Sequence, residues 1–242
     1  MSESMLSVEN LSAWYDSARI LYDLSFNVGR GEVVALMGRN GAGKSTTIKT
    51  IMGLIGRRRG TVRFNGEDIS RREPYEIARR GLGYAPEDRR IFADLTVMEN
   101  LDVGRQAPRR FADGRTLPAW TPQRLFALFP NLAEMPDRLG SRMSGGEQQM
   151  LTVARTLMGN PLLVLLDEPS EGVAPLIVEQ MANTIIELKK EGLSILLSEQ
   201  NVHFARLVSD RVYVLEKGHM CWQGSMDALM RDQDVQRAYL TV

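Results

Sequence analysis

This sequence has few of the features that would place a chain outside the ordinary soluble proteins. It contains one cysteine, Cys221, so no disulfide can form within the chain, and a reducing compartment fits. Its 30 Lys and Arg residues balance 30 Asp and Glu residues. A net charge of zero argues against a nucleic-acid-binding protein that depends on bulk electrostatics, and we expect no nucleic acid among the partners.

Long hydrophobic runs are also missing. The longest, such as PLLVLL, are far too short to cross a bilayer. The first residues, MSESMLSVENLSAWY, show no basic region followed by an apolar run, which predicts that they are not a secretory signal. What remains is a chain of 242 residues, 43% of them hydrophobic, long enough for one large core or two modest ones.

Strand and helix patterns follow one another in both outer parts of the chain. The first part predicts strands at 5–15, 24–28 and 31–38, a helix from about Lys44, and a strand with a turn at Asn65 and Gly66. The last part predicts strands at 162–168, 193–200 and 211–218, with helices from about Pro175 to Lys190 and from about Val202. Strands separated by helices imply a parallel sheet, so we expect an α/β core.

The middle of the chain has a different character. From about Asp88 to Asn160 there is little strand signal, and helix starts recur at Thr96, Thr121 and Ser144. The first and last carry a glutamate three residues later, as in a capping box, and the middle one is followed by a proline. Residues 104–120, GRQAPRRFADGRTLPAW, read as the least constrained loop. The pattern predicts a helical insert within the α/β core.

The strongest motif is GRNGAGKS, Gly38 to Ser45, which matches a phosphate loop and lies between a predicted strand and a predicted helix. Its glycines let backbone N–H groups approach phosphate oxygens, and the helix N-terminus favours an anion. Lys44 would reach the β- and γ-phosphates and the Ser45 hydroxyl would ligate Mg²⁺. The alternative is a glycine-rich turn that only caps the helix. The residues expected to bind nucleotide here are Gly38, Arg39, Asn40, Gly41, Ala42, Gly43, Lys44, Ser45 and Thr46.

The strand LLVLLDE delivers Asp167 and Glu168 at its carboxyl end, the edge where ligands bind in open α/β sheets. Asp167 fits the acid on the Mg²⁺ side of a phosphate-loop NTPase. Glu168 could polarise the attacking water as a general base. The alternative is a carboxylate that only stabilises a helix N-terminus.

A second glycine-rich segment, SGGEQQ, begins at Ser144. Capping explains Ser144 and Glu147, but not Gly145 and Gly146, since glycines weaken a first turn. Glycines at a helix N-terminus fit a close approach of the backbone to an anion. One ATP does not need two such cradles, so the second is expected to serve the ATP of another copy.

Together, GRNGAGKS, SGGEQQ and LLVLLDE, in this order and with a helical insert between the first two, resemble the ATP-binding cassette of ABC transporters. The resemblance covers essentially the whole chain. It implies an α/β phosphate-loop NTPase cassette with a mainly parallel core sheet, an antiparallel β subdomain and an inserted helical subdomain. We expect one domain, 1–242, with its core at about 1–87 and 161–242 and the helical subdomain at about 88–160. In this family two cassettes close head to tail over two ATP molecules.

The same resemblance implies further site residues. Tyr15 falls where the family stacks an aromatic ring on adenine, although a strand aromatic in the core is the alternative. Glu87 stands where most members have a glutamine that contacts metal or water, so the resemblance implies a role in catalysis and Mg²⁺ binding. The residue departs from the family, because a carboxylate lacks the donor of the amide and adds charge near Mg²⁺. Gln200 stands where the family has a histidine that senses the γ-phosphate, and unlike histidine it cannot titrate. Glu147 replaces the usual glutamine of the signature.

PEDRRIF, MSGGEQQML and SEQN look like the smaller ATPase subunit of the bacterial high-affinity branched-chain amino acid importers. This likeness implies a peripheral protein on the cytoplasmic face of the inner membrane. Its expected partners are a second cassette (a paralogous ATPase subunit), two transmembrane permease subunits and a periplasmic substrate-binding protein. Glu171 favours another substrate class. The amino acid importers tend to have an apolar residue at this position, and the related urea importers look similar to this chain there.

The sequence does not fit two other classes of protein. A soluble ABC ATPase acting on nucleic acid or ribosomes often carries two cassettes and a basic linker, and neither is found in this sequence. A phosphate-loop GTPase would have an Asn-Lys-x-Asp base-reading motif, which is absent, and neither a GTPase nor a kinase needs SGGEQQ.

Overall fold

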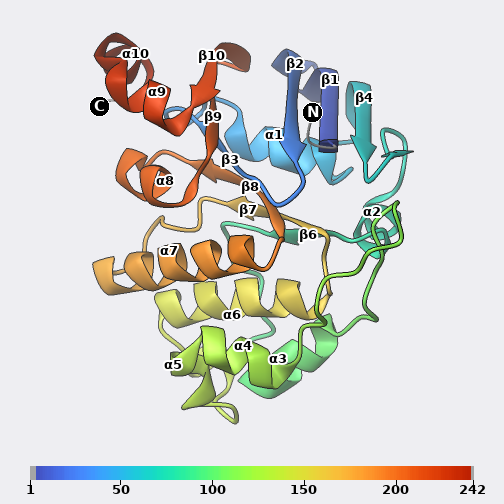
Figure 1. Cartoon of the computed structure of the whole chain (residues 1–242), viewed down its shortest axis with the longest axis vertical. Coiled ribbons are helices and arrows are strands. Elements are labelled where there is room, and N and C mark those ends of the chain that lie inside the picture. The colour runs from blue at the N-terminus through green and yellow to red at the C-terminus, as the bar shows by residue number, and fades with distance from the viewer. Residues whose placement is uncertain (1–3, 241–242) are drawn as a thin grey trace.

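The computed structural model describes residues 4–240, which form two β-sheets with helices packed around them (Figure 1). The antiparallel sheet has the order β2-β1-β4-β5 and the larger sheet has the order β10-β9-β3-β8-β7-β6. The strands of the antiparallel sheet are β1 (Ser4–Tyr15), β2 (Ala18–Gly29), β4 (Arg57–Phe64) and β5 (Glu67–Asp68). Those of the larger sheet are β3 (Val33–Met37), β6 (Leu82–Ala85), β7 (Leu163–Asp167), β8 (Ser194–Glu199), β9 (Arg211–Glu216) and β10 (His219–Ser225).

Five neighbouring strands of the larger sheet are parallel, and only β10 runs antiparallel at its edge. The strands β3 and β7 are buried along their whole length, as the apolar run of β3 and the four apolar residues that begin β7 predict. Because the strands are parallel, the segments that follow β3, β6, β7 and β8 all emerge at one edge of the sheet. The predicted fold class, a mainly parallel core with an antiparallel sheet and inserted helices, is confirmed.

Helices cover both faces of the parallel sheet. On one face, α1 (Lys44–Ile51) lies between it and the antiparallel sheet, and their apolar side chains form one core. On the other face, α6 (Gly145–Met158), α7 (Pro175–Lys190) and α8 (Val202–Val208) form a second core. The remaining helical elements are α2 (Pro74–Arg79), α3 (Val97–Gly104), α4 (Pro122–Leu128), α5 (Pro130–Ala133), the 3₁₀ helix η1 (Gly140–Arg142), α9 (Met226–Arg231) and α10 (Gln233–Tyr239).

All three predicted helix starts of the middle region are confirmed. Thr96 and Ser144 cap α3 and α6 in complete capping boxes with Glu99 and Glu147. Thr121 caps α4, which begins at the predicted proline. These starts depend on residues three apart in sequence, so local chemistry was enough to predict them.

The prediction that residues 104–120 are the least constrained loop is wrong in one respect. The segment after α3 forms no helix or strand, but it is anchored at several points. Phe111 is 4% exposed and lies under the Arg30 guanidinium, 3.4 Å from its ring centre, while Arg30 also pairs with Asp113 at 2.7 Å. Asn65 accepts the N–H of Ala112 at 2.9 Å. These contacts join distant parts of the sequence, so no local pattern shows them.

Short elements were also missed. β6 contains Gly83 and spans only four residues, α2 spans six, and β10, α9 and α10 follow the last predicted strand. Residues 57–59 begin β4, and the Arg57 and Arg59 guanidiniums lie over the Trp14 ring. Within residues 4–240, none of the helices combines the length and apolar character needed to cross a bilayer.

Candidate functional site

The glycine-rich loop between β3 and α1 has the backbone that its glycines predict. Gly38, Gly41 and Gly43 have φ values of 149°, 79° and 106°. A side chain at Gly38 would place its Cβ 2.3 Å from the Leu215 carbonyl oxygen. Arg39, Asn40 and Gly41 are exposed at the tip of the loop, whereas Ala42 and Gly43 are buried. Ser45 and Thr46 are half-buried in the first turn of α1, whose N-terminus opens into the loop.

Lys44 is buried, with 3% of its surface exposed, and lies folded back on the loop. Its Nζ donates to the Gly38 carbonyl at 2.9 Å and to the Arg39 carbonyl at 3.3 Å. It also forms an ion pair with Glu168, 3.0 Å from Oε1. The structure therefore brings the predicted phosphate-binding lysine and the predicted general base into direct contact.

Asp167 is fixed by two hydroxyl groups at the end of β7. Ser198 Oγ donates to Oδ1 at 2.7 Å and Tyr84 Oη donates to Oδ2 at 3.2 Å. Burial, followed by the charge of Asp167, raises the pKa of Tyr84, so the phenol keeps its proton and remains a donor. Ser198 and Tyr84 were not identified from the sequence. They come from β8 and β6, which flank β7, and only the strand order places them there.

Glu168 has an unusual backbone and an incompletely satisfied side chain. Its φ is 47°, in the left-handed region that non-glycine residues seldom adopt, and its N–H donates to Ser198 Oγ at 3.0 Å. The residue is 6% exposed. Oε1 is held by Lys44, but among the described residues no N–H or O–H donor is assigned to the buried Oε2.

Glu171 adds a carboxyl group that sequence reasoning had used only as a marker of substrate class. Its N–H donates to the Glu168 carbonyl at 3.1 Å, which closes a tight turn. A hydrogen bond between the two carboxyl groups would require a proton on one of them, since two ionised carboxylates offer no donor. The contact with Glu168, together with burial and the charges of Glu168 and Glu87, raises the pKa of Glu171 to about 7.

Gln200 follows β8 and faces Glu171, with its Nε2 3.0 Å from Oε2. The neighbouring Glu199 is 1% exposed and accepts the N–H groups of Ser170 and Asn201, both at 3.1 Å. Burial raises the pKa of Glu199 to about 7, although these hydrogen bonds oppose the shift. The structure thus assembles Lys44, Asp167, Glu168 and Gln200 at one sheet edge. Glu87 is exposed in the loop after β6, near enough for its charge to raise the pKa of Glu171.

The predicted metal ligands offer the oxygen donors that Mg²⁺ prefers. Asp167 presents a fixed carboxylate, and Ser45 places a hydroxyl on the first turn of α1, a helix that contacts β7. Within the described residues there is no cluster of three or more His, Cys, Asp or Glu side chains able to hold a metal alone. This donor set fits an Mg²⁺ ion bound by one or two carboxylates together with phosphates and water.

The second glycine-rich segment lies away from this cluster. It begins α6, on the opposite face of the parallel sheet from α1 (Figure 1). Ser144 and Glu147 form the capping box, with the Ser144 N–H donating to Glu147 Oε2 at 2.7 Å. The glycines also have an internal reason. A Cβ at Gly145 would lie 2.8 Å from Arg89 Nη1, and one at Gly146 would lie 2.8 Å from the Ile177 side chain.

Tyr15 ends β1 and is 46% exposed, so the alternative that it is a core aromatic does not hold. Its ring is free to contact a ligand from solvent.

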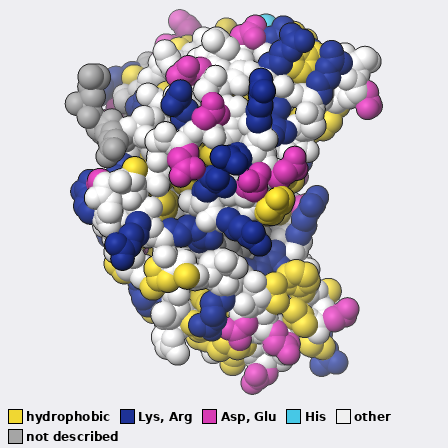
Figure 2. All heavy atoms as spheres, turned by 90° about the vertical axis from the view of Figure 1, so that its right-hand side faces the viewer, with side chains coloured by type: hydrophobic (Ala, Val, Ile, Leu, Met, Phe, Trp, Pro, Cys, Tyr) yellow, Lys and Arg dark blue, Asp and Glu magenta, His cyan; other side chains and the backbone are white. Residues whose placement is uncertain are grey.

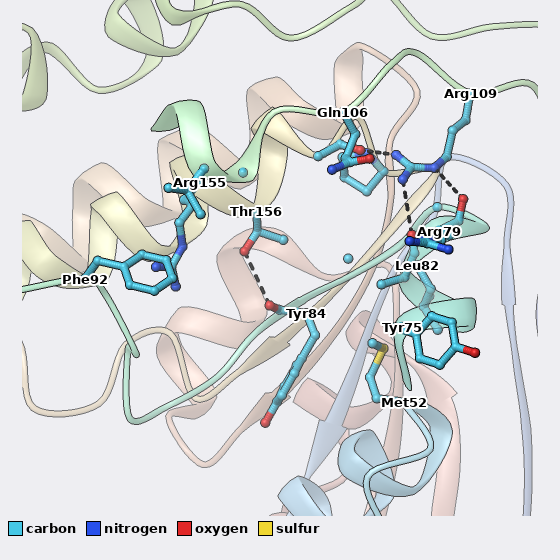
Figure 3. Close-up of a pocket in the computed structure, with 17 residues that line it drawn as sticks. Met52, Tyr75, Arg79, Leu82, Tyr84, Phe92, Gln106, Arg109, Arg155 and Thr156 are labelled. Atoms are coloured by element: carbon cyan, nitrogen blue, oxygen red, sulfur yellow. Dashed lines mark hydrogen bonds between the residues drawn. The ribbon is translucent and has the colours of Figure 1, made fainter. Parts of the chain in front are cut away.

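A separate groove of about 540 Å³ lies between α2, β6, α3 and α6 (Figure 3). Tyr75, Phe92 and Val103 are exposed there, with 61%, 48% and 53% of their surfaces accessible. Arg155 lies beside Phe92 and donates to the Arg90 carbonyl at 2.7 Å, while its buried Nη1 has no partner among the described residues. Figure 2 shows this side of the molecule, where Lys and Arg side chains gather around exposed hydrophobic ones.

Comparisons with known proteins agree with this geometry. The family model described as ABC transporter matches residues 21–171. The chain is 40% identical over 236 residues to the high-affinity branched-chain amino acid transport ATP-binding protein BraG of Pseudomonas aeruginosa, covering 98% of this chain and 99% of that protein. It is 37% identical over 245 residues to the lipopolysaccharide export system ATP-binding protein LptB of Haemophilus influenzae, covering 98% and 97%.

Solved structures give the same picture. An ATP-binding subunit of an ABC transporter matches with a TM-score of 0.79 at 31% identity, covering 98% of this chain and 96% of that one. A nucleotide-free ATP-binding cassette from an ABC transporter also matches with a TM-score of 0.79, at 27% identity and 96% and 97% coverage. These relatives share the fold over their whole length.

Proposed function

This chain belongs to the ABC transporter family and is an ATPase subunit of a transporter, and from that premise we propose that it powers the import of branched-chain amino acids. The observation that carries the substrate class is the 40% identity to BraG over nearly the full length of both chains. The motifs PEDRRIF, MSGGEQQML and SEQN support it.

In the proposed site, ATP binds along Gly38–Thr46 and its adenine stacks on Tyr15. The Lys44 ammonium, now bonded to the Gly38 and Arg39 carbonyls and to Glu168, turns to the β- and γ-phosphates. Mg²⁺, when bound with the nucleotide, neutralises phosphate charge, and Ser45, Asp167 and Glu87 are the residues that would hold it. Release from Lys44 frees the Glu168 carboxylate to accept a proton from the attacking water.

A second cassette completes the site. Ser144–Glu147 opens α6 on the opposite side of the sheet from the phosphate loop, so in our proposal it contacts the ATP held by the opposing cassette. ABC ATPase cassettes work as dimers with transmembrane subunits, and we propose a paralogous ATPase subunit as the partner. ATP contacts made only in the closed dimer would shift the equilibrium towards closure.

We propose that the groove beside residues 86–90 lies on the side of the chain that faces the membrane subunits. Exposed Tyr75, Phe92 and Val103 offer apolar contact area. Tyr84 links the groove to the proposed nucleotide site. Its carbonyl accepts a hydrogen bond from Thr156 at 3.4 Å (Figure 3), and its hydroxyl donates to Asp167. In this proposal the two transmembrane permease subunits dock here, and the chain sits peripherally on the cytoplasmic face of the inner membrane. A periplasmic binding protein supplies the substrate.

Lipopolysaccharide export is the second candidate, because LptB matches almost as well as BraG. Lipopolysaccharide export was not among the alternatives that the sequence suggested. The urea importer that Glu171 favours stays a prediction. The test compares cells carrying the wild-type gene with cells carrying its Glu168→Gln form. Selective loss of labelled leucine uptake supports our proposal. Loss of labelled urea uptake alone would favour a urea importer, and loss of lipopolysaccharide from the cell surface with leucine uptake intact would favour export.

A further inference from the structure

The Glu168 carboxylate has a buried oxygen, Oε2, to which no donor is assigned among the described residues. Glu168 is 6% exposed, and its two carboxylate oxygens have different surroundings. Oε1 faces the Lys44 ammonium at 3.0 Å, whereas Oε2 is buried with no N–H or O–H donor assigned to it in the part of the chain that the structure describes. A buried carboxylate oxygen left without a donor is unfavourable, so this position calls for a partner.

Glu171 is placed to be that partner. The turn closed by its N–H and the Glu168 carbonyl brings the two residues together, and the Glu168 carboxyl has the largest influence on the raised pKa of Glu171. Oε2 of Glu171 also accepts a hydrogen bond from the Gln200 amide at 3.0 Å. The result is a chain of contacts that runs Gln200, Glu171, Glu168, Lys44.

We propose that Glu171 is a positioning residue for ATP hydrolysis, which holds the Glu168 carboxylate through Oε2 and links it to Gln200. The inference rests on the proposed role of Glu168 as general base. A general base needs a third group that orients it, as in catalytic triads. When Lys44 moves to the phosphates, Glu168 loses its partner on Oε1. Glu171 then remains as the group that keeps the carboxylate aimed, and Oε1 is free to meet the water.

The same contacts give Gln200 a role in orienting the base. The glutamine cannot titrate, and in this chain its amide contacts Glu171 rather than Glu168. Gln200 therefore acts on the base through Glu171. If it does, the effects of changing the two residues will overlap rather than multiply.

The test measures kcat and KM for ATP in the purified full chain and in matched variants. Glu171→Leu removes both contacts, and we expect kcat to fall about tenfold with KM for ATP within about twofold of wild type, because misorientation of a base acts on the chemical step. Glu171→Gln keeps both contacts, since its amide donates to Glu168 and its oxygen accepts from Gln200, so we expect it to restore most of kcat. Glu179→Leu makes the same chemical change on an exposed position of α7 and serves as the control.

The double variant Glu171→Leu with Gln200→Ala should be no slower than Glu171→Leu alone. The proposal is overturned if Glu171→Leu has the kcat of wild type, if Glu171→Gln is as slow as Glu171→Leu, or if the two losses multiply in the double variant. Glu168→Gln separates this failure from a failure of the proposed site. If Glu168→Gln abolishes hydrolysis while Glu171→Leu does not, only the positioning role is wrong. If Glu168→Gln hydrolyses ATP at the wild-type rate, the site assignment itself is wrong.

Discussion

Lys44 and Glu168 form an ion pair whose side chains are only 3% and 7% exposed. Desolvating two charges opposes much of their attraction, so such a pair adds little net stability, but removing one partner leaves an uncompensated buried charge. In the proposed function, nucleotide binding breaks this pair when Lys44 turns to the phosphates.

Lys44→Met should lower the free energy of unfolding by about 3 kcal/mol, because the Glu168 carboxylate loses its cation. Adding Glu168→Gln should recover much of this loss, since the amide carries no charge to compensate. Urea unfolding of the single and double variants measures both values. Equal stability of the two variants would show that the buried charge is not the cause.

Glu199 is a further buried acid, and burial raises its pKa to about 7, from an ordinary value of 4.5. Between these two values the unfolded chain has released the proton while the folded chain still binds it. Stability from this group is therefore fully present below pH 4.5 and is lost as the pH rises to about 7.

Glu199→Gln removes this titration. The free energy of unfolding of the variant, minus that of wild type, should rise across this pH range by up to about 3 kcal/mol. Denaturant titrations at several pH values measure how this difference in free energy changes with pH. The change with pH is the test, because the amide also alters the hydrogen bond with the Asn201 N–H and so adds an offset that does not depend on pH. A difference that does not change with pH would show that Glu199 ionises normally.

At the scale of single elements, α3 and α6 offer a matched pair. Each begins with a complete capping box, at Thr96 and at Ser144. Only α6 carries the glycines expected to face the opposing ATP.

Thr96→Ala and Ser144→Ala should each lower the free energy of unfolding by about 1 kcal/mol, the usual loss of an N-cap. Only Ser144→Ala should also lower the rate of ATP hydrolysis. Thermal unfolding and a steady-state ATPase assay on both variants compare the two effects. If both variants hydrolyse ATP at the same rate, Ser144 is a cap and nothing more.

The loop after α3 tests an expectation that the structure corrected. Phe111→Ala should lower the free energy of unfolding by about 3 kcal/mol, as for other buried phenylalanines. Phe92→Ala, which changes a 48% exposed ring, should change it by about 0.5 kcal/mol or less. Urea unfolding compares them, and equal small losses would restore the description of residues 104–120 as an unconstrained loop.

The elements also show what a sequence can predict. Signals carried by neighbouring residues were sufficient for the phosphate loop, the Asn65-Gly66 turn and the three helix caps. Contacts between distant segments were not predictable. The Tyr84–Asp167 hydrogen bond, the Gln200–Glu171 contact and the packing of Arg89 on Gly145 each join residues that only the strand order and helix packing bring together.

For the whole molecule, the fold places two glycine-rich segments on opposite faces of one sheet and a groove along its edge. Lys44, Asp167 and Glu168 converge where the parallel strands end, and Tyr84 connects that point to the groove. In the proposed function, a change at the nucleotide would reach the groove through Tyr84 and the opposing cassette through Ser144–Glu147.

The central claim is that this acidic and basic cluster hydrolyses ATP with Glu168 as the base. The most direct measurement follows ATP binding and single-turnover hydrolysis in wild type and in Glu168→Gln, whose amide keeps an oxygen for Lys44. Our account predicts ATP affinity at least equal to that of wild type, because the Lys44 contact that ATP must break is weaker, and hydrolysis slowed by about 10²–10⁴-fold, the range of general-base catalysis. Hydrolysis by Glu168→Gln at the wild-type rate would contradict it.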